Sequence, residues 1–145
     1  MRAPLGNCVL NNTDENIGFL VGGIGITPVI SIIEYIIDKN LNADVCLFYS
    51  NRSEDEIAFK EELNRWQSKN SKIKVIYTIT DYEPEDRSCA FGRIDKKLVM
   101  GKDKRFLQRV VFIFGPPGMV DMMRNLCIEV GVASSEIKTE KFLGY

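Results

Sequence analysis

Apolar residues recur along this chain in two alternating patterns. Short and mostly apolar runs cover residues 17–21, 45–49, 74–79, 110–114 and, more weakly, 137–141. Apolar side chains spaced three or four residues apart cover residues 28–38, 56–69 and 119–130. The first pattern predicts buried strands and the second predicts amphipathic helices. Residues 81–103 are polar and predict a loop with a short helix near residues 95–99.

The alternation of strands and helices predicts the fold class. Strands separated by helices of about a dozen residues form βαβ units, and such units build a parallel sheet. Parallel strands are covered on both faces, which explains their apolar runs. We therefore expect an α/β fold: a doubly wound, mostly parallel five-stranded sheet with helices on both faces.

Composition excludes several functional classes. The chain has 145 residues, a formal net charge of −1, no histidine and four cysteines without CxxC spacing. The absence of histidine removes Ser-His-Asp and Cys-His hydrolases. The cysteine spacing predicts no metal centre, and the charge predicts no nucleic-acid surface. No apolar run is long enough to span a membrane, so we expect a cytoplasmic protein in a reducing compartment.

The first strand is followed by a glycine-rich turn that opens a helix. Gly22, Gly23 and Gly25 precede Thr27 and Pro28. Glycines let a backbone turn tightly and approach a phosphate, and a helix N-terminus offers free N–H groups to an anion. A side chain at Gly25 is therefore expected to obstruct a phosphate while the fold survives. The alternative is a purely structural turn, because loose G-x-G patterns are common.

Three further segments join this turn in one resemblance. Residues 22–28 resemble a GGxGxTP turn, and residues 49–63 resemble a YxNRxxxDxxFxxEL segment. Residues 115–119 resemble a CGPPGM turn, and residues 140–142 resemble a terminal ExF. In this order the four segments resemble the NAD(P)-binding domain of ferredoxin–NADP reductase-like flavoproteins.

The resemblance implies a function and a set of binding residues. NAD(P)H would lie across the carboxyl ends of the strands and pass a hydride to FAD or FMN, held mostly outside this chain. Electrons would then reach an acceptor such as a ferredoxin or an iron–sulfur or haem centre. The implied cofactor-binding residues are Gly22, Gly23, Gly25, Thr27, Pro28, Asn51, Arg52, Asp81, Gly115, Pro116, Gly118 and Met119.

Departures from the family pattern lead to further expectations. Phe114 stands where the family often has a cysteine close to the nicotinamide, so Phe114 and Phe142 are expected beside the reacting rings. The R-x-Y-[ST] motif of the flavin-binding barrel is absent. Residues 1–12 are therefore expected to be the end of such a barrel or a linker, and residues 13–145 the NAD(P)-binding domain. The chain would be a C-terminal domain or a subunit that borrows its flavin.

The residues after the third strand bear on the choice of dinucleotide. NADP-selective members of the family place a serine and an arginine where Thr80 and Asp81 stand here. A carboxylate accepts hydrogen bonds from ribose hydroxyls but repels a 2′-phosphate, so Asp81 favours NADH. Arg52 opposes this preference if its side chain reaches the same pocket.

Other interpretations remain open at this point. Thr27, Arg52, Met119, Phe142 and Tyr145 are each about equally compatible with a structural or solvent-exposed role. The chain as a whole is also compatible with an electron-transfer subunit of a larger complex, or with a non-catalytic nucleotide-binding module.

Overall fold

The computed structural model describes the backbone of residues 2–5 and 8–11 and all of residues 15–142. A two-stranded antiparallel hairpin, β1 (Arg2–Leu5) and β2 (Cys8–Asn11), precedes the main sheet. Whether residues 1–12 end a flavin-binding barrel remains a prediction, and Tyr145 lies outside the described residues.

The main sheet is parallel and has six strands. They run in the order β6-β5-β4-β3-β7-β8. Their bounds are β3 (Asn16–Gly22), β4 (Asp44–Asn51), β5 (Ile73–Ile79), β6 (Ala90–Phe91), β7 (Val110–Gly115) and β8 (Ile137–Lys141). The chain winds outward from β3 to β6 and then returns to the other side of β3 through β7. The doubly wound fold is confirmed, and the strand count differs from the expected five because β6, two residues long, is too short for a periodic signal.

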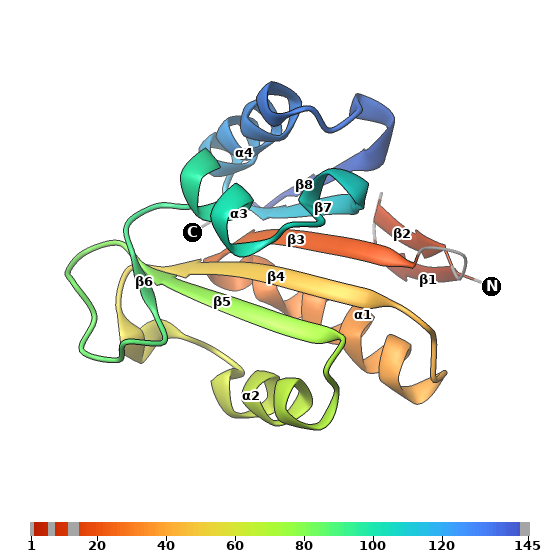
Figure 1. The fold of residues 1–145 in the computed structure, drawn as a ribbon, viewed down its shortest axis with the longest axis horizontal. Helices are drawn as coiled ribbons and strands as arrows, with labels where there is room; N and C mark the ends of the chain where they lie inside the picture. The colour runs from red at the N-terminus through yellow and green to blue at the C-terminus, as the bar shows by residue number, and fades with distance from the viewer. Residues whose placement is uncertain (1, 6–7, 12–14, 143–145) are drawn as a thin grey trace.

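Helices cover both faces of this sheet. Helices α1 (Ile26–Asp38) and α2 (Lys60–Lys69) lie on one face, and α3 (Lys96–Lys102) and α4 (Pro117–Val130) lie on the other (Figure 1). Because strand side chains alternate, Phe112 and Phe114 of β7 enter the α1–α2 core, while Val111 and Ile113 enter the α3–α4 core. Each core is therefore one continuous apolar layer.

The second helix begins later than its periodicity predicts. The expected helix spans residues 56–69, but α2 begins at Lys60, after a separate 3-10 turn at Glu54–Glu56. Phe59 lies between them with a φ of 62°, in the left-handed region. This conformation is rare for a bulky residue. It turns Phe59 away from the helix face on which Leu63 is buried.

A buried ionic cluster lies at the amino edge of the sheet. Arg109 is 5% exposed, and its Nε donates to Asp103 Oδ2 at 2.7 Å. The same guanidinium donates to the backbone oxygens of Ile17 at 3.3 Å and Asp44 at 2.8 Å. Arg109 thus joins the starts of β3 and β4 through hydrogen bonds to their backbone.

Candidate functional site

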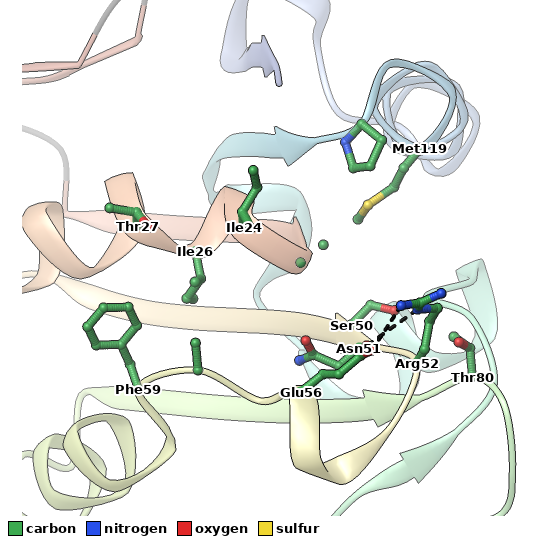
Figure 2. Close-up of a pocket in the computed structure, with 14 residues that line it drawn as sticks. Ile24, Ile26, Thr27, Ser50, Asn51, Arg52, Glu56, Phe59, Thr80 and Met119 are labelled. Atoms are coloured by element: carbon green, nitrogen blue, oxygen red, sulfur yellow. Dashed lines mark hydrogen bonds and ion pairs between the residues drawn. The ribbon is translucent and has the colours of Figure 1, made fainter. Parts of the chain in front are cut away.

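A cavity of about 690 Å³ lies at the carboxyl edge of the sheet (Figure 2). It is lined by the turn after β3, the end of β4, the residue after β5 and the turn after β7. These elements meet where the chain reverses its direction of winding, between β3 and β7. In open α/β sheets, ligands bind in the crevice at such a switch point.

The glycine turn forms one wall of the cavity. Gly22 and Gly23 line it, and Gly23 has a φ of 55° that glycine adopts without strain. The first turn of α1 follows directly and contains no acidic residue. Thr27 in that turn is exposed and lines the cavity, whereas Pro28 does not. The helix N-terminus and the turn together form a wall of the kind that presents backbone N–H groups to an anion.

Gly25 has a different role from the one expected. It is buried and does not line the cavity. A Cβ built on Gly25 would lie 2.6 Å from the carbonyl oxygen of Phe114. A side chain here would therefore disturb the packing against β7, contrary to the expectation that it would act on the phosphate alone, and contact between Gly25 and a phosphate remains a prediction. The missing side chain allows the 3-10 turn at Gly23–Gly25, which precedes α1, to pack closely against β7.

Asn51 places an unpaired donor in the cavity wall. The residue is 6% exposed and lines the cavity, and its Nδ2 is buried without a hydrogen-bond partner in the part of the chain that the structure describes. The neighbouring Tyr49 hydroxyl accepts from the Ala58 N–H at 3.1 Å and donates to the Ala58 oxygen at 3.3 Å. Burial raises the pKa of the Tyr49 hydroxyl, and the nearby Asn51 amide lowers it in part. The contact between Asn51 Nδ2 and this hydroxyl does not have the geometry of a normal hydrogen bond. Buried polar groups are nearly always paired, so this amide lacks a partner that a ligand can provide.

Charged residues gather at the rim beside the end of β4. Arg52 Nη2 contacts Glu56 Oε1 at 2.9 Å, and both residues line the cavity. The backbone N–H of Asp81 donates to the Arg52 oxygen at 3.1 Å. Asp81 itself is exposed and lies next to Thr80, which does line the cavity. The structure thus brings Arg52 and Asp81 together, although they lie on different strand ends.

The turn after β7 forms the opposite wall. Pro116 and Met119 line the cavity, and the Met119 side chain points toward the glycine turn in Figure 2. A Cβ on Gly115 would lie 2.9 Å from the Met119 sulfur, so Gly115 gives this side chain room. Gly118 is exposed and outside the lining. A second cavity of about 300 Å³ shares Met119, Ser50 and Thr80 and adds Arg93, Met122 and Met123.

Phe114 does not face the cavity, contrary to expectation. Its side chain is 0% exposed and belongs to the α1–α2 core. Its ring centroid lies 6.2 Å from that of Phe112 and 6.3 Å from that of Phe142. The alternation of side chains along β7 explains why the Phe114 ring points into the core and not into the cavity. Only the backbone of Phe114 approaches the glycine turn. Phe142 is partly buried against the same core, and its backbone N–H donates to the Gly115 oxygen at 2.9 Å.

Sequence reasoning missed several lining residues. Ile24, Ile26, Glu56 and Phe59 all line the cavity. Glu56 and Phe59 were expected on the second helix, and their position depends on the late start of α2. The left-handed backbone conformation of Phe59 cannot be predicted from the spacing of apolar residues in this segment. Ile24 is 57% exposed in the glycine turn, where its apolar character is the only sequence indication.

Among the described residues, no group of acidic or cysteine side chains is placed to hold a metal ion. In the same part of the chain, no helix has both the length and the apolar character needed to cross a membrane.

Comparison with known proteins identifies the family. The model of the oxidoreductase NAD-binding domain matches residues 19–125. An NADH-cytochrome b5 reductase-like protein of Arabidopsis thaliana is 30% identical over 112 residues, covering 76% of this chain and 34% of the relative. A flavohemoprotein of Candida albicans is 32% identical over 147 residues, covering 98% of this chain and 35% of the relative. The chain therefore spans about a third of each of these relatives.

Solved structures agree with this assignment. A flavohemoglobin from Malassezia yamatoensis superimposes with a TM-score of 0.76 at 28% identity, covering 90% of this chain and 32% of that one. The Amycolatopsis cytochrome P450 reductase GcoB shares the fold, with a TM-score of 0.82 at 19% identity over 97% of this chain and 42% of that one. With a cavity at the switch point and a family match over most of its length, this chain belongs to the oxidoreductase NAD-binding domain family.

Proposed function

We propose that this chain binds NAD(P)H across the carboxyl edge of the sheet and presents its nicotinamide to a flavin held mostly outside the chain. The flavin, FAD or FMN, would sit in a separate domain or subunit. Electrons would then pass to an acceptor protein with an iron–sulfur or haem centre. The relatives named as cytochrome b5 reductase-like protein and flavohemoprotein support a haem acceptor, and a cytoplasmic location is part of the same proposal.

The buried Nδ2 of Asn51 is the observation that carries this proposal. Asn51 lines a cavity, and its buried Nδ2 has no hydrogen-bond partner among the described residues. Leaving a buried donor unpaired costs about 1–3 kcal/mol, and a ligand oxygen recovers this cost. Phosphate, ribose and carboxamide groups of a dinucleotide all offer such oxygens. The Asn51 side of the cavity therefore suits a polar group of a ligand, whereas Ile24, Ile26 and Met119 make other parts of the lining apolar.

The walls of the cavity suggest how the dinucleotide lies. The glycine turn and the α1 N-terminus suit the pyrophosphate, because both present backbone N–H groups to an anion. Pro116 and Met119 bound the switch-point side, which suits the nicotinamide half. The ends of β4 and β5, with Arg52 and Asp81, then receive the adenosine half. Gly25, Gly115 and Phe114 support these walls through packing.

The chain's own contribution to the reaction is positioning. When bound, NAD(P)H supplies the hydride and the flavin accepts it, so the protein provides orientation and water exclusion. Well-oriented reacting groups gain roughly 7–11 kcal/mol of barrier reduction. Apolar side chains of Ile24, Ile26 and Met119 exclude water from the cavity. A chain without histidine is sufficient for this task, because no proton has to be moved by an imidazole.

NADH is the preferred dinucleotide in this proposal. Asp81 is exposed beside the cavity rim, where its carboxylate accepts hydrogen bonds from ribose hydroxyls and repels a 2′-phosphate.

Calorimetry with NADH tests the binding proposal. Asn51→Asp replaces the buried donor with an anion, and we expect it to weaken NADH binding by about tenfold or more. Asn125→Asp makes the same change in charge on the exposed side of α4, outside the cavity, and serves as the matched control. Equal affinities for both variants, with both folded by circular dichroism, would refute the proposal. Stoichiometric FAD bound to this chain alone would refute the assignment of the flavin to another part.

A further inference from the structure

We propose that Glu56 is a specificity residue that holds Arg52 away from the 2′-phosphate of NADPH. The preference for NADH over NADPH would then depend on two carboxylates, those of Glu56 and Asp81, which act in different ways. The inference rests on the proposed function and adds a residue to it. Asp81 acts directly on the ligand, whereas Glu56 acts through Arg52.

The geometry of the Arg52–Glu56 pair carries the first step. Nη2 of Arg52 lies 2.9 Å from Oε1 of Glu56, and Nε lies 3.4 Å from Oε2. Both carboxylate oxygens therefore face the guanidinium in a forked arrangement, as Figure 2 shows. Forked arginine–carboxylate contacts are directional and compete with a phosphate for the same N–H groups.

The turn that carries Glu56 is itself held in place. The Glu54 N–H donates to the Tyr82 hydroxyl at 3.0 Å, and the Glu85 N–H donates to Glu54 Oε1 at 3.3 Å. The Glu56 N–H donates to the Ser53 oxygen at 3.2 Å. These bonds fasten the 3-10 turn at Glu54–Glu56 to the segment after β5. Glu56 is therefore a fixed partner for Arg52, although both side chains are partly exposed.

Asp81 adds a second carboxylate on the same rim. Hydrogen bonds from Thr80 N–H to the Asn51 oxygen at 3.0 Å and from Asp81 N–H to the Arg52 oxygen at 3.1 Å join the two strand ends. The hydrogen bond from Glu56, and then the charge of Asp81, raise the pKa of Arg52. Glu56 contacts the guanidinium and Asp81 acts on it through its charge, so these three side chains together carry a net negative charge at the rim of the cavity. The carboxylates repel a 2′-phosphate there, and the guanidinium of Arg52, which could bind the phosphate, is already paired with Glu56.

The size of the effect follows from exposure. The side chain of Arg52 is 73% exposed and that of Glu56 is 43% exposed, so water and salt screen their contact. Exposed ion pairs are weak, and we expect the release of Arg52 to improve NADPH binding by about threefold to tenfold. NADH affinity should change less, because its ribose hydroxyls carry no charge.

A double-mutant cycle tests the route through Arg52. The dissociation constants of NADH and NADPH are measured for the full chain, for Glu56→Gln, for Arg52→Gln and for the double variant. Glu61→Gln is the matched control, since it removes the same charge from an exposed site on α2 outside the cavity. We expect Glu56→Gln to shift the NADPH-to-NADH affinity ratio toward NADPH at low salt, Glu61→Gln to leave it unchanged, and the shift to disappear in the Arg52→Gln background.

Two results would overturn the inference while leaving the proposed function intact. One is an unchanged ratio in Glu56→Gln. The other is an equal shift with and without Arg52, which would mean that Glu56 acts by its own charge. Failure of the unaltered chain to bind either dinucleotide would instead refute the proposed function, and this inference with it.

Discussion

The backbone of Phe114 occupies the space where a side chain on Gly25 would begin. A Cβ on Gly25 would lie 2.6 Å from the Phe114 oxygen and 2.7 Å from its carbonyl carbon. Backbone cannot move aside as a flexible side chain can, so the approach of the turn at Gly23–Gly25 to β7 depends on glycine at this position. The cavity wall after β3 and the turn after β7 are both held by this contact.

Gly25→Ala is therefore predicted to destabilise the fold, and Gly118→Ala is its control. Overpacking at Gly25 should lower the free energy of unfolding by about 1–3 kcal/mol. Gly118 lies in the first turn of α4 with no atom within 4 Å of a built Cβ, so alanine there should raise stability by up to about 1 kcal/mol. Urea denaturation followed by circular dichroism measures both. Equal free energies of unfolding for Gly25→Ala and the unaltered chain would contradict this prediction. They would mean that the turn at Gly25 and β7 can move apart without loss of stability.

Phe114 is predicted to matter for stability more than for contact with the dinucleotide. Its buried ring packs between Phe112 and Phe142, and Phe114→Ala should lower the free energy of unfolding by about 3–5 kcal/mol. Met122→Ala, at a side chain that is 53% exposed, should cost far less. Phe114→Leu keeps most of the volume and should bind NADH with nearly unchanged affinity. A large loss of NADH affinity in a stably folded Phe114→Leu variant would contradict this prediction and would mean that Phe114 contacts the dinucleotide.

The dinucleotide preference is predicted to depend on Asp81. The unaltered chain should bind NADH more tightly than NADPH, and Asp81→Arg should move the ratio of the two dissociation constants by about tenfold or more toward NADPH. The cause is replacement of a repelling carboxylate by a guanidinium that pairs with the 2′-phosphate. Asp121→Arg makes the same change on exposed α4, outside the cavity, and should not alter the ratio. A tenfold preference for NADPH in the unaltered chain would contradict the prediction.

Stability is predicted to fall at alkaline pH because of two buried thiols. Burial raises the pKa of Cys46 to about 12 and that of Cys127 to about 12, from an ordinary value of 9.0. The native state holds these protons more tightly than the unfolded state. The contribution of the two protonated thiols to the free energy of unfolding is therefore complete below pH 9. It is lost as pH rises toward 12, by at most about 1.4 kcal/mol per pH unit for each thiol.

Chemical denaturation from pH 8 to pH 11 measures this slope. The double variant Cys46→Ala, Cys127→Ala should be less stable overall but should show a shallower decline with pH. An identical slope in the double variant would assign the alkaline loss to other groups. Tyr77 is one such group, since burial raises its pKa as well.

Much of the fold follows from local patterns in the chain. Continuous apolar runs identify β3, β4, β5 and β7, because a strand covered on both faces must be apolar throughout. The spacing of Val29, Ile32, Ile33 and Ile36 identifies α1 for a similar reason. The glycine turn and the Gly-Pro-Pro turn are equally local, so their positions on the same sheet edge follow from the parallel topology. The family and the doubly wound sheet are predictable from these features together.

The roles of individual side chains at the site depend on contacts between distant segments. Gly25 packs against β7 rather than opening on the cavity, and Phe114 enters the core, because strand register and the crossing of α1 decide which way each position points. Phe59 and Glu56 reach the cavity because the Tyr49 hydroxyl holds Ala58 and delays the start of α2. Arg52 and Asp81, which lie 29 positions apart in the printed sequence, meet through backbone bonds between strand ends. Such contacts carry no local signal, since their free energy comes from groups that only folding brings together.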